Sequence, residues 1–134
     1  MTLTFVDAGV LIAAARGAGS AASTAAEILD DPDRSFASSV FVRLEVLPKA
    51  VFHRKAQEAE FYEAFFESVD IWVSPDHLLA EQAMTLAARF GLSALDALHV
   101  AAAMAAGVDE VVTSEKLSRP IHRVTGLAVK SIHL

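Results

Sequence analysis

Five short runs of apolar and β-branched residues alternate with segments of helical length, and this alternation restricts the chain to few folds. The runs span residues 3–6, 36–39, 71–73, 108–113 and 127–132. Gly or Pro breaks separate several of the segments, as at Gly17, Pro32 and Gly91. Strands that are joined by helices in this way form parallel sheets. We therefore predict an α/β fold with a mostly parallel sheet that helices cover on both faces.

The segments between these runs carry helical patterns. Apolar residues at helical spacing, together with start and stop residues, predict helices over 8–16, 20–29, 40–52, 54–67, 76–90 and 93–107. Pro48 is expected to kink the third of these helices or to end its first part. Acids interrupt the apolar positions of 54–67, which is typical of an amphipathic helix.

The chain has 134 residues, which predicts a single domain over 1–134 with a core large enough to need no disulfide or structural metal. It contains no Cys, so thiolate zinc sites and cysteine nucleophiles are excluded. The five His residues show no HExxH spacing, which disfavours zinc. The hydrophobic core must therefore supply the stability.

Charge and hydropathy also narrow the functional classes. The formal net charge of -6 and the pI near 5.2 argue against a broad basic surface for duplex nucleic acid. The N-terminus lacks the basic start and long apolar run of a signal peptide, and the longest charge-free run, 97–108, is too short to span a membrane. We expect a cytoplasmic protein without a membrane segment.

Two acidic positions follow predicted strands, where ligands of parallel sheets bind. Asp7 comes directly after the first strand, and Glu115 follows the fourth strand in the sequence TSEK. Each has a structural alternative: Asp7 suits a helix N-cap, and Glu115 suits a solvated loop beside Lys116. Asp96 lies three residues after Ser93, which fits a capping box.

Glu45 has no evident partner within its own predicted helix. Its neighbours are largely apolar, and Arg43 is two residues away, so the two side chains point to different sides of a helix. A distant cation, a bound metal or solvent exposure remain open for this carboxylate. If Glu45 joins the other acids, divalent cations must offset their repulsion, and Mg²⁺ or Mn²⁺ suits oxygen ligands. His99 lies on the same helical face as Asp96 and is the one His residue that the sequence favours as a metal ligand.

Three segments, in this order, resemble a PIN domain, the fold of VapC-type toxin ribonucleases. They are LTFVDAGVLIAAARG, VFVRLEVL and GLSALDALHVAAAMAAGVDEVVTSEK. The resemblance covers essentially the whole chain, and its last segment is the most specific. It implies a PIN-like three-layer α/β/α fold with a mostly parallel sheet of about five strands and with acids gathered at the carboxyl edge.

The resemblance also implies a site. Asp7, Glu45, Asp96 and Glu115 match the family's metal-binding and catalytic acids, and Thr113 matches the Thr that precedes the last acid. The family commonly has Asp where this chain has Glu115. The Glu side chain is one methylene longer, so its carboxylate lies further from the backbone. The implied activity is an Mg²⁺- or Mn²⁺-dependent endoribonuclease that cleaves RNA with water as the nucleophile. An antitoxin protein and a homodimer are the implied partners.

Other classes remain open at this point. A catalytically silent PIN-like module that binds RNA or protein would use the same acids as helix caps. A haloacid-dehalogenase phosphatase would need Asp-x-Asp after the first strand, where this chain has Ala8 and Gly9. The cations close to the motifs are candidates for phosphate contacts or ordinary surface charges: Arg16, Arg43, Lys116, Arg119 and Arg123.

The predicted helix over 54–67 carries two aromatic pairs at i and i+4 spacing, Phe61 with Phe65 and Tyr62 with Phe66. One pair is enough to fill a core-facing stripe. Either both pairs are core, or one of them lines a groove for a second copy of the chain or for an antitoxin helix.

Overall fold

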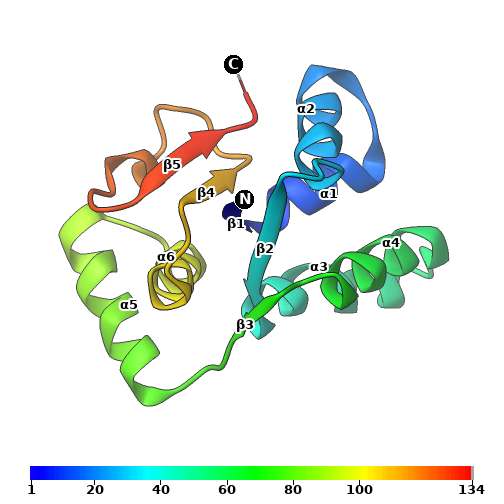
Figure 1. Ribbon diagram of the computed structural model, residues 1–134. Helices are drawn as coiled ribbons and strands as arrows, with labels where there is room; N and C mark the ends of the chain where they lie inside the picture. Colours follow the sequence, from blue (N-terminus) through cyan, green and yellow to red (C-terminus); the bar gives the residue numbers. More distant parts are fainter. Residues whose placement is uncertain (134) are drawn as a thin grey trace.

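Within residues 1–133, which the computed structural model describes, five parallel strands form one sheet (Figure 1). Their order in the sheet is β3-β2-β1-β4-β5, and every neighbouring pair is parallel. The strands are β1 (Thr2–Val6), β2 (Arg34–Ser39), β3 (Ile71–Val73), β4 (Glu110–Thr113) and β5 (Ala128–Ser131). The predicted parallel sheet of about five strands is confirmed.

The order of strands reverses at the centre of the sheet. The chain starts in β1, moves outward through β2 and β3, and returns to place β4 on the other side of β1. The register pairs Val6 with Val112, and the Asp7 N–H donates to the Val112 carbonyl at 3.1 Å. Residues that follow β1 and β4 therefore lie side by side at the switch point, where ligands of such sheets bind.

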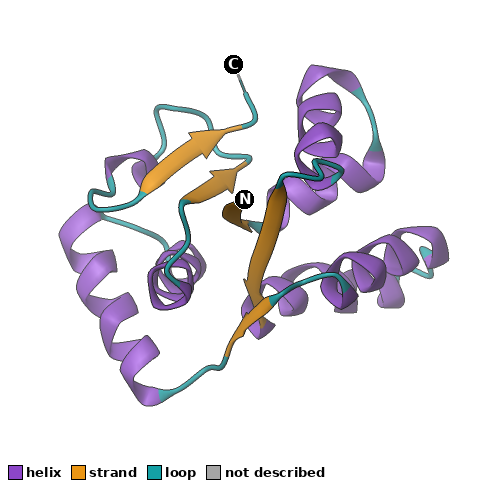
Figure 2. Ribbon diagram, in the orientation of Figure 1, coloured by secondary structure: helices purple, strands orange, loops and turns teal. Residues whose placement is uncertain are grey.

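Helices cover both faces of this sheet, which confirms the three-layer arrangement. Figure 2 shows α1 to α4 gathered on one side and α5 with α6 on the other. The helices are α1 (Ala8–Arg16), α2 (Gly19–Leu29), α3 (Val40–Phe52), α4 (Ala56–Glu67), α5 (His77–Phe90) and α6 (Ala94–Ala106). A short 3₁₀ turn, η1 (Pro120–Arg123), was not predicted from the sequence.

Helix α3 continues through Pro48, so the proline does not end the helix. Proline removes the N–H that would donate to the carbonyl of Leu44. Both Leu44 and Pro48 lie on the exposed side of the helix, where water can replace the missing donor. Buried contacts on the opposite side, through Val42, Val46 and Ala50, hold the helix against the rest of the protein.

The core lies around the two central strands. Phe5 and Val6 of β1 and Val111 and Val112 of β4 are buried, as expected for strands covered on both faces. Helix α6 presents a buried run, residues 100–103, that is rich in Ala. These small side chains let α6 lie close to the sheet, and its N-terminus is thereby brought to the sheet edge.

The aromatic residues of α4 belong to the core. Tyr62 is 1% exposed and Phe66 is 3% exposed, while Phe65 packs edge-on against Phe36 of β2 with ring centroids 5.5 Å apart. Phe61 alone is partly exposed, at 36%. The hypothesis that an aromatic pair of this helix lines a partner groove is therefore wrong, since three of the four rings are already covered within the chain.

In the part of the chain that the structure describes, no single helix is long and apolar enough to cross a membrane. The pair α5 and α6 passes that test together, by length and composition only, with a bend of 117° between the two helices.

Candidate active site

Asp7 ties the start of α1 to the loop after β4. Its backbone is extended, and its Oδ1 accepts hydrogen bonds from the N–H groups of Val10 at 3.2 Å and Ser114 at 3.4 Å. Its Oδ2 accepts a hydrogen bond from the Thr113 hydroxyl. The predicted helix cap is confirmed, and the same carboxylate also reaches the switch point of the sheet.

The Asp7 carboxyl is 5% exposed, and its burial raises its pKa. The Thr113 hydroxyl, the Val10 N–H and the charge of His99 oppose this rise without cancelling it. Burial disfavours the ionised form of a carboxyl unless positive charge is nearby. A perturbed carboxyl at the ligand-binding edge of a parallel sheet is a candidate for function.

Thr113 holds two of the predicted acids in place. Its hydroxyl donates to Asp7 and also accepts a hydrogen bond from the Glu115 N–H at 3.0 Å. Thr113 itself is fully buried at the end of β4. It therefore fixes the Asp7 carboxylate relative to the loop that carries Glu115, which is a positioning role.

Gly9 allows the loop after β4 to approach α1 closely. A Cβ atom at Gly9 would lie 1.7 Å from the Ser114 Oγ and 2.7 Å from the Ser114 Cβ. Only glycine fits such a contact without a shift of the loop. In the sequence, Gly9 only departs from a phosphatase motif, and no local pattern marks its contact with Ser114 because the two residues are far apart in the chain.

Asp96 lies in the first turn of α6, behind the Ser93 cap. The Ser93 hydroxyl oxygen accepts from the Asp96 N–H at 3.3 Å, so Ser93 supplies the cap of this helix. Burial and the charge of Glu115 raise the pKa of the Asp96 carboxyl, and the charge of Glu45 adds to this rise. The charges of Glu115 and Glu45 are therefore close enough to affect the ionisation of Asp96.

The partner of Glu45 is His99, whose Nε2 forms a hydrogen bond with the Glu45 Oε1. The His99 ring is 2% exposed and packs against Phe5, with ring centroids 6.0 Å apart. Its Nδ1 is buried, and no hydrogen-bond partner for it exists among residues 1–133. His99 therefore holds the Glu45 carboxylate through Nε2, while its Nδ1 is buried and not accessible to a ligand.

Glu115 is partly exposed and forms an ion pair with Arg119, whose Nε lies 3.4 Å from the Glu115 Oε2. It is therefore neither a freely solvated loop residue nor a buried ligand. We call Asp7, Glu45, Asp96 and Glu115 the acidic centre. Asp7 follows β1 and Glu115 follows β4 at the switch point, and Glu45 and Asp96 come from α3 and α6.

The donor set of the acidic centre fits a hard divalent cation. Among the described residues, no three acidic or histidine side chains converge into a ready ligand sphere. Mg²⁺ keeps several waters and uses one or two carboxylates, so it does not need such a sphere. Burial and the charges of Glu115 and Glu45 raise the pKa of Asp96, and a nearby cation would oppose both effects.

The candidate phosphate-binding cations separate into two groups. Arg43 pairs with Glu63 at 2.9 Å on the outer side of α3, and Arg123 donates to the Phe90 carbonyl at 3.3 Å. Neither is directed at the acidic centre. Arg119 reaches it through Glu115, and Arg16 lies beside a cavity that Glu45 also lines.

The family model of the PIN domain matches residues 4–119. This match spans β1 to the loop after β4 and contains all four residues of the acidic centre. The chain belongs to the PIN domain family, as the sequence resemblance implied. The comparison with curated proteins gives no match.

Solved structures with the same fold come from toxin-antitoxin systems. A chain of VapBC2 from Rickettsia felis, bound to a DNA fragment from its promoter, matches with a TM-score of 0.72 and 14% identity over 96% of this chain and 98% of that chain. DNA-bound VapBC from Salmonella typhimurium matches with a TM-score of 0.70 and 17% identity over 98% of this chain and 99% of that chain. VapC20 from Mycobacterium tuberculosis is a toxin that cleaves the sarcin-ricin loop. It matches with a TM-score of 0.69 and 17% identity over 93% of this chain and 96% of that chain.

Proposed function

We propose that this protein is an Mg²⁺- or Mn²⁺-dependent endoribonuclease that hydrolyses RNA phosphodiester bonds at the acidic centre. The observation that carries the proposal is the raised pKa of the Asp96 carboxyl, caused by burial and by the charges of Glu115 and Glu45. His99 and Arg119 are the partners of Glu45 and Glu115, and a cation would offset the repulsion that remains among these acids. Cation binding explains their arrangement, and membership of the PIN family supports it.

Asp7 and Asp96 are the residues that we assign to the cation, with Glu45 and Glu115 completing its surroundings through carboxylate or water contacts. A divalent cation bound there neutralises charge on the phosphate and lowers the pKa of water. Thr113 keeps the Asp7 carboxylate turned to the edge of the sheet, and His99 does the same for Glu45. No side-chain nucleophile is required for hydrolysis by water.

We further propose that the protein is the toxin of a toxin-antitoxin pair and that it forms a homodimer. Structures of similar fold include VapBC complexes from Rickettsia felis and Salmonella typhimurium and a toxin-antitoxin complex from Klebsiella pneumoniae. Co-purification with the product of a small neighbouring gene, together with sedimentation of the purified protein, tests both partners.

The proposed activity is tested with two isosteric variants, Asp7→Asn and Asp96→Asn. Each removes one charge from the acidic centre with little change in shape, so we expect RNA cleavage to fall to background while the circular dichroism spectrum stays unchanged. Asp30→Asn is the matched control, because Asp30 is exposed at the end of α2. Chelator should stop cleavage by the wild type, and added Mg²⁺ or Mn²⁺ should restore it.

Two results would contradict this proposal. Cleavage that persists in chelator excludes the cation-dependent mechanism. Wild-type protein that binds RNA or a protein partner but cleaves nothing with either cation would instead establish a silent PIN-like binding module, in which the acids act only as caps and ion-pair partners.

A further inference from the structure

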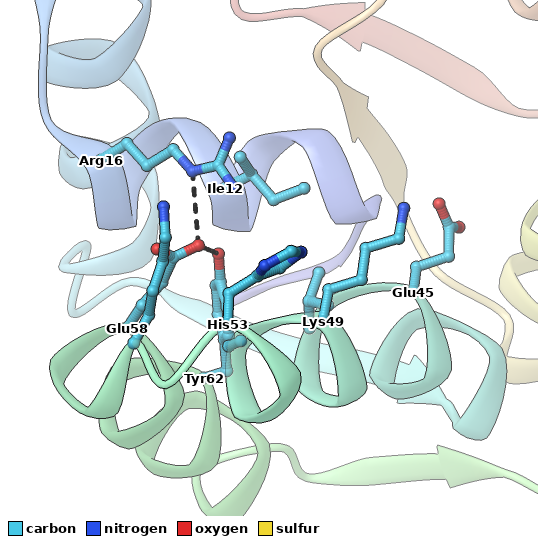
Figure 3. A pocket seen from close by; sticks show the side chains of 10 residues that line it. Ile12, Arg16, Glu45, Lys49, His53, Glu58 and Tyr62 are labelled. Carbon is cyan, nitrogen blue, oxygen red and sulfur yellow. Dashed lines mark hydrogen bonds and ion pairs between the residues drawn. The ribbon is translucent and has the colours of Figure 1, made fainter.

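A cavity of about 250 Å³ lies between α1, α3 and the start of α4, directly beside the acidic centre. Glu45 lines the cavity and also belongs to the acidic centre. Figure 3 shows Lys49 and His53 following Glu45 along α3, with their side chains directed towards α1. Arg16 of α1 lines the cavity from the other side, and Lys55 lines it at the start of α4. We call this space the basic cavity.

Two acids line the basic cavity, and both are engaged by other residues. Glu58 accepts a hydrogen bond from the Tyr62 hydroxyl at 2.7 Å and pairs with the Arg16 Nε at 3.3 Å. The Tyr62 hydroxyl holds the pKa of Glu58 below its usual value. Glu45 is held by His99. The charge of Lys55 also helps to lower the pKa of Glu58, but neither acid forms an ion pair with a lysine of the cavity.

Lys49 and Lys55 have no acidic partner in the described part of the chain, where no carboxylate lies within 4.0 Å of either ammonium group. Of the eleven Lys and Arg residues, five have a carboxylate within 4.0 Å among residues 1–133, and six do not, Lys49 and Lys55 among them. Two unpaired lysines facing one polar cavity leave positive charge for a ligand.

The spacing of these groups matches a chain of regularly placed anions. Glu45, Lys49 and His53 are each separated by four residues, so they lie about 6 Å apart along the axis of α3. Adjacent phosphates of a nucleic acid strand are separated by a similar distance. An RNA strand whose cleaved phosphate sits at the acidic centre would thus carry its next phosphate to Lys49.

We propose that the basic cavity binds the backbone of the RNA next to the cleaved bond, with Lys49 contacting the adjacent phosphate and His53, Arg16 and Lys55 the nucleotide beyond it. The inference rests on the proposed endoribonuclease function and deepens it. The acidic centre repels every phosphate except the one that its cation neutralises. A cation one helical turn away offsets this repulsion where the strand leaves the centre.

The inference is tested by RNA binding and by steady-state kinetics with Lys49→Gln. Binding of a short, fluorophore-labelled single-stranded RNA is measured by anisotropy in chelator, where no cation-dependent cleavage occurs. We expect Lys49→Gln to weaken binding by about tenfold and to lower the slope of log affinity against log salt by about 0.7, one phosphate contact on a single strand. KM should rise by a similar factor, with kcat within about twofold of the wild type.

The contact is assigned to one phosphate with RNA that carries a neutral methylphosphonate at a single position on either side of the mapped cleavage site. At the phosphate next to the cleaved bond, the substitution should raise the KM of the wild type in Mg²⁺ but add little to the rise in Lys49→Gln. Arg89→Gln is the charge-matched control, because Arg89 is exposed on α5, on the other side of the sheet.

Several outcomes overturn the inference. One is that the wild type and Lys49→Gln bind RNA equally well. Another is that the methylphosphonate has the same effect in both proteins. A third is Lys49-dependent binding of an acidic oligoglutamate peptide with no binding of RNA, which would make the cavity a protein site. Cleavage with an unchanged KM in Lys49→Gln overturns the cavity assignment alone. Lys49-dependent RNA binding by a wild type that never cleaves overturns only the proposed hydrolysis.

Discussion

The acidic centre and the basic cavity share Glu45, but they hold their charges in opposite ways. Asp7 in the acidic centre is buried and fixed by the Thr113 hydroxyl and by two backbone N–H groups. Lys49 and Lys55 of the basic cavity are exposed on long side chains. One region is therefore built before any ligand arrives, whereas the other can adapt to its ligand.

Under the proposed function, this difference explains how an acidic protein could act on RNA, which is also acidic. Holding like charges near one another is costly to the fold, and a cation bound among them would offset that cost. Exposed cations cost little and attract a strand over distances close to the Debye length, about 8 Å at physiological salt. The acidic centre is suited to chemistry, and the basic cavity is suited to holding the substrate.

The largest effect that separates the two regions is expected from Glu45→Gln, because Glu45 belongs to both. Loss of its charge should lower kcat by about 100-fold, the upper end for residues that support a metal site. The same change makes the basic cavity more positive, so RNA binding in chelator should become a few-fold tighter. Measured on one preparation, kcat and RNA affinity should move in opposite directions.

Glu60→Gln is the control for this variant, since Glu60 is exposed on α4 and lines neither region. If Glu45→Gln lowers kcat and weakens RNA binding together, the two regions are one site without the division of roles that their charges suggest.

A smaller effect is expected at the loop contact that shapes the acidic centre. Gly9→Ala places a methyl group against Ser114, and the shift of this loop should displace the hydroxyl of Thr113 from Asp7. We expect kcat to fall by about tenfold, because small displacements of catalytic groups are costly. RNA binding by the basic cavity should not change.

The double variant Gly9→Ala with Ser114→Gly removes both clashing atoms and should recover most of the lost kcat. A double variant as poor as Gly9→Ala alone would show that Gly9 is needed for a reason other than this contact. Ser114→Gly by itself controls for the loss of the serine side chain.

The sequence predicted the elements well because their signals are local. The sheet strands are apolar runs, and α6 begins at Ser93 and ends at Gly107, which adopts a positive φ of 68°. The order of the strands also placed Asp7 and Glu115 at one edge, as parallel pairing requires. The helix over 40–52 was predicted, but Pro48 does not end its first part, because a proline signal is local whereas the packing of Val42 and Val46 is tertiary.

The interior of the site was harder to predict because its contacts join distant residues. The partner of Glu45 is His99, which lies 54 residues further along the chain, and the identity of this pair depends on how α3 packs against α6. The interpretation of α4 failed for a similar reason. Its aromatic residues exceed one stripe, but Phe36 of β2 and Trp72 of β3 cover the rings from outside the helix.

The smallest effect is expected on stability, with Asp96→Asn in chelator. Burial and the charge of Glu115 raise the pKa of Asp96 in the folded protein. A carboxyl whose pKa is raised by folding destabilises the fold once the pH passes the pKa of the unfolded chain, about 3.9. This cost grows with pH until the folded pKa is passed.

Asp96→Asn removes that cost, so the variant should melt slightly higher than the wild type at neutral pH in chelator. The difference should shrink to zero in acid, where the wild-type carboxyl is protonated in both states. The rise should be small, about 2 °C, because Asp96 is only half-buried and its charge also interacts favourably with the N-terminus of α6. With saturating Mg²⁺ the order should reverse, since only the wild type gains stability from full cation binding. A variant that melts far below the wild type under both conditions would show that Asp96 mainly caps α6, and the acidic centre would lose one of its two principal ligands.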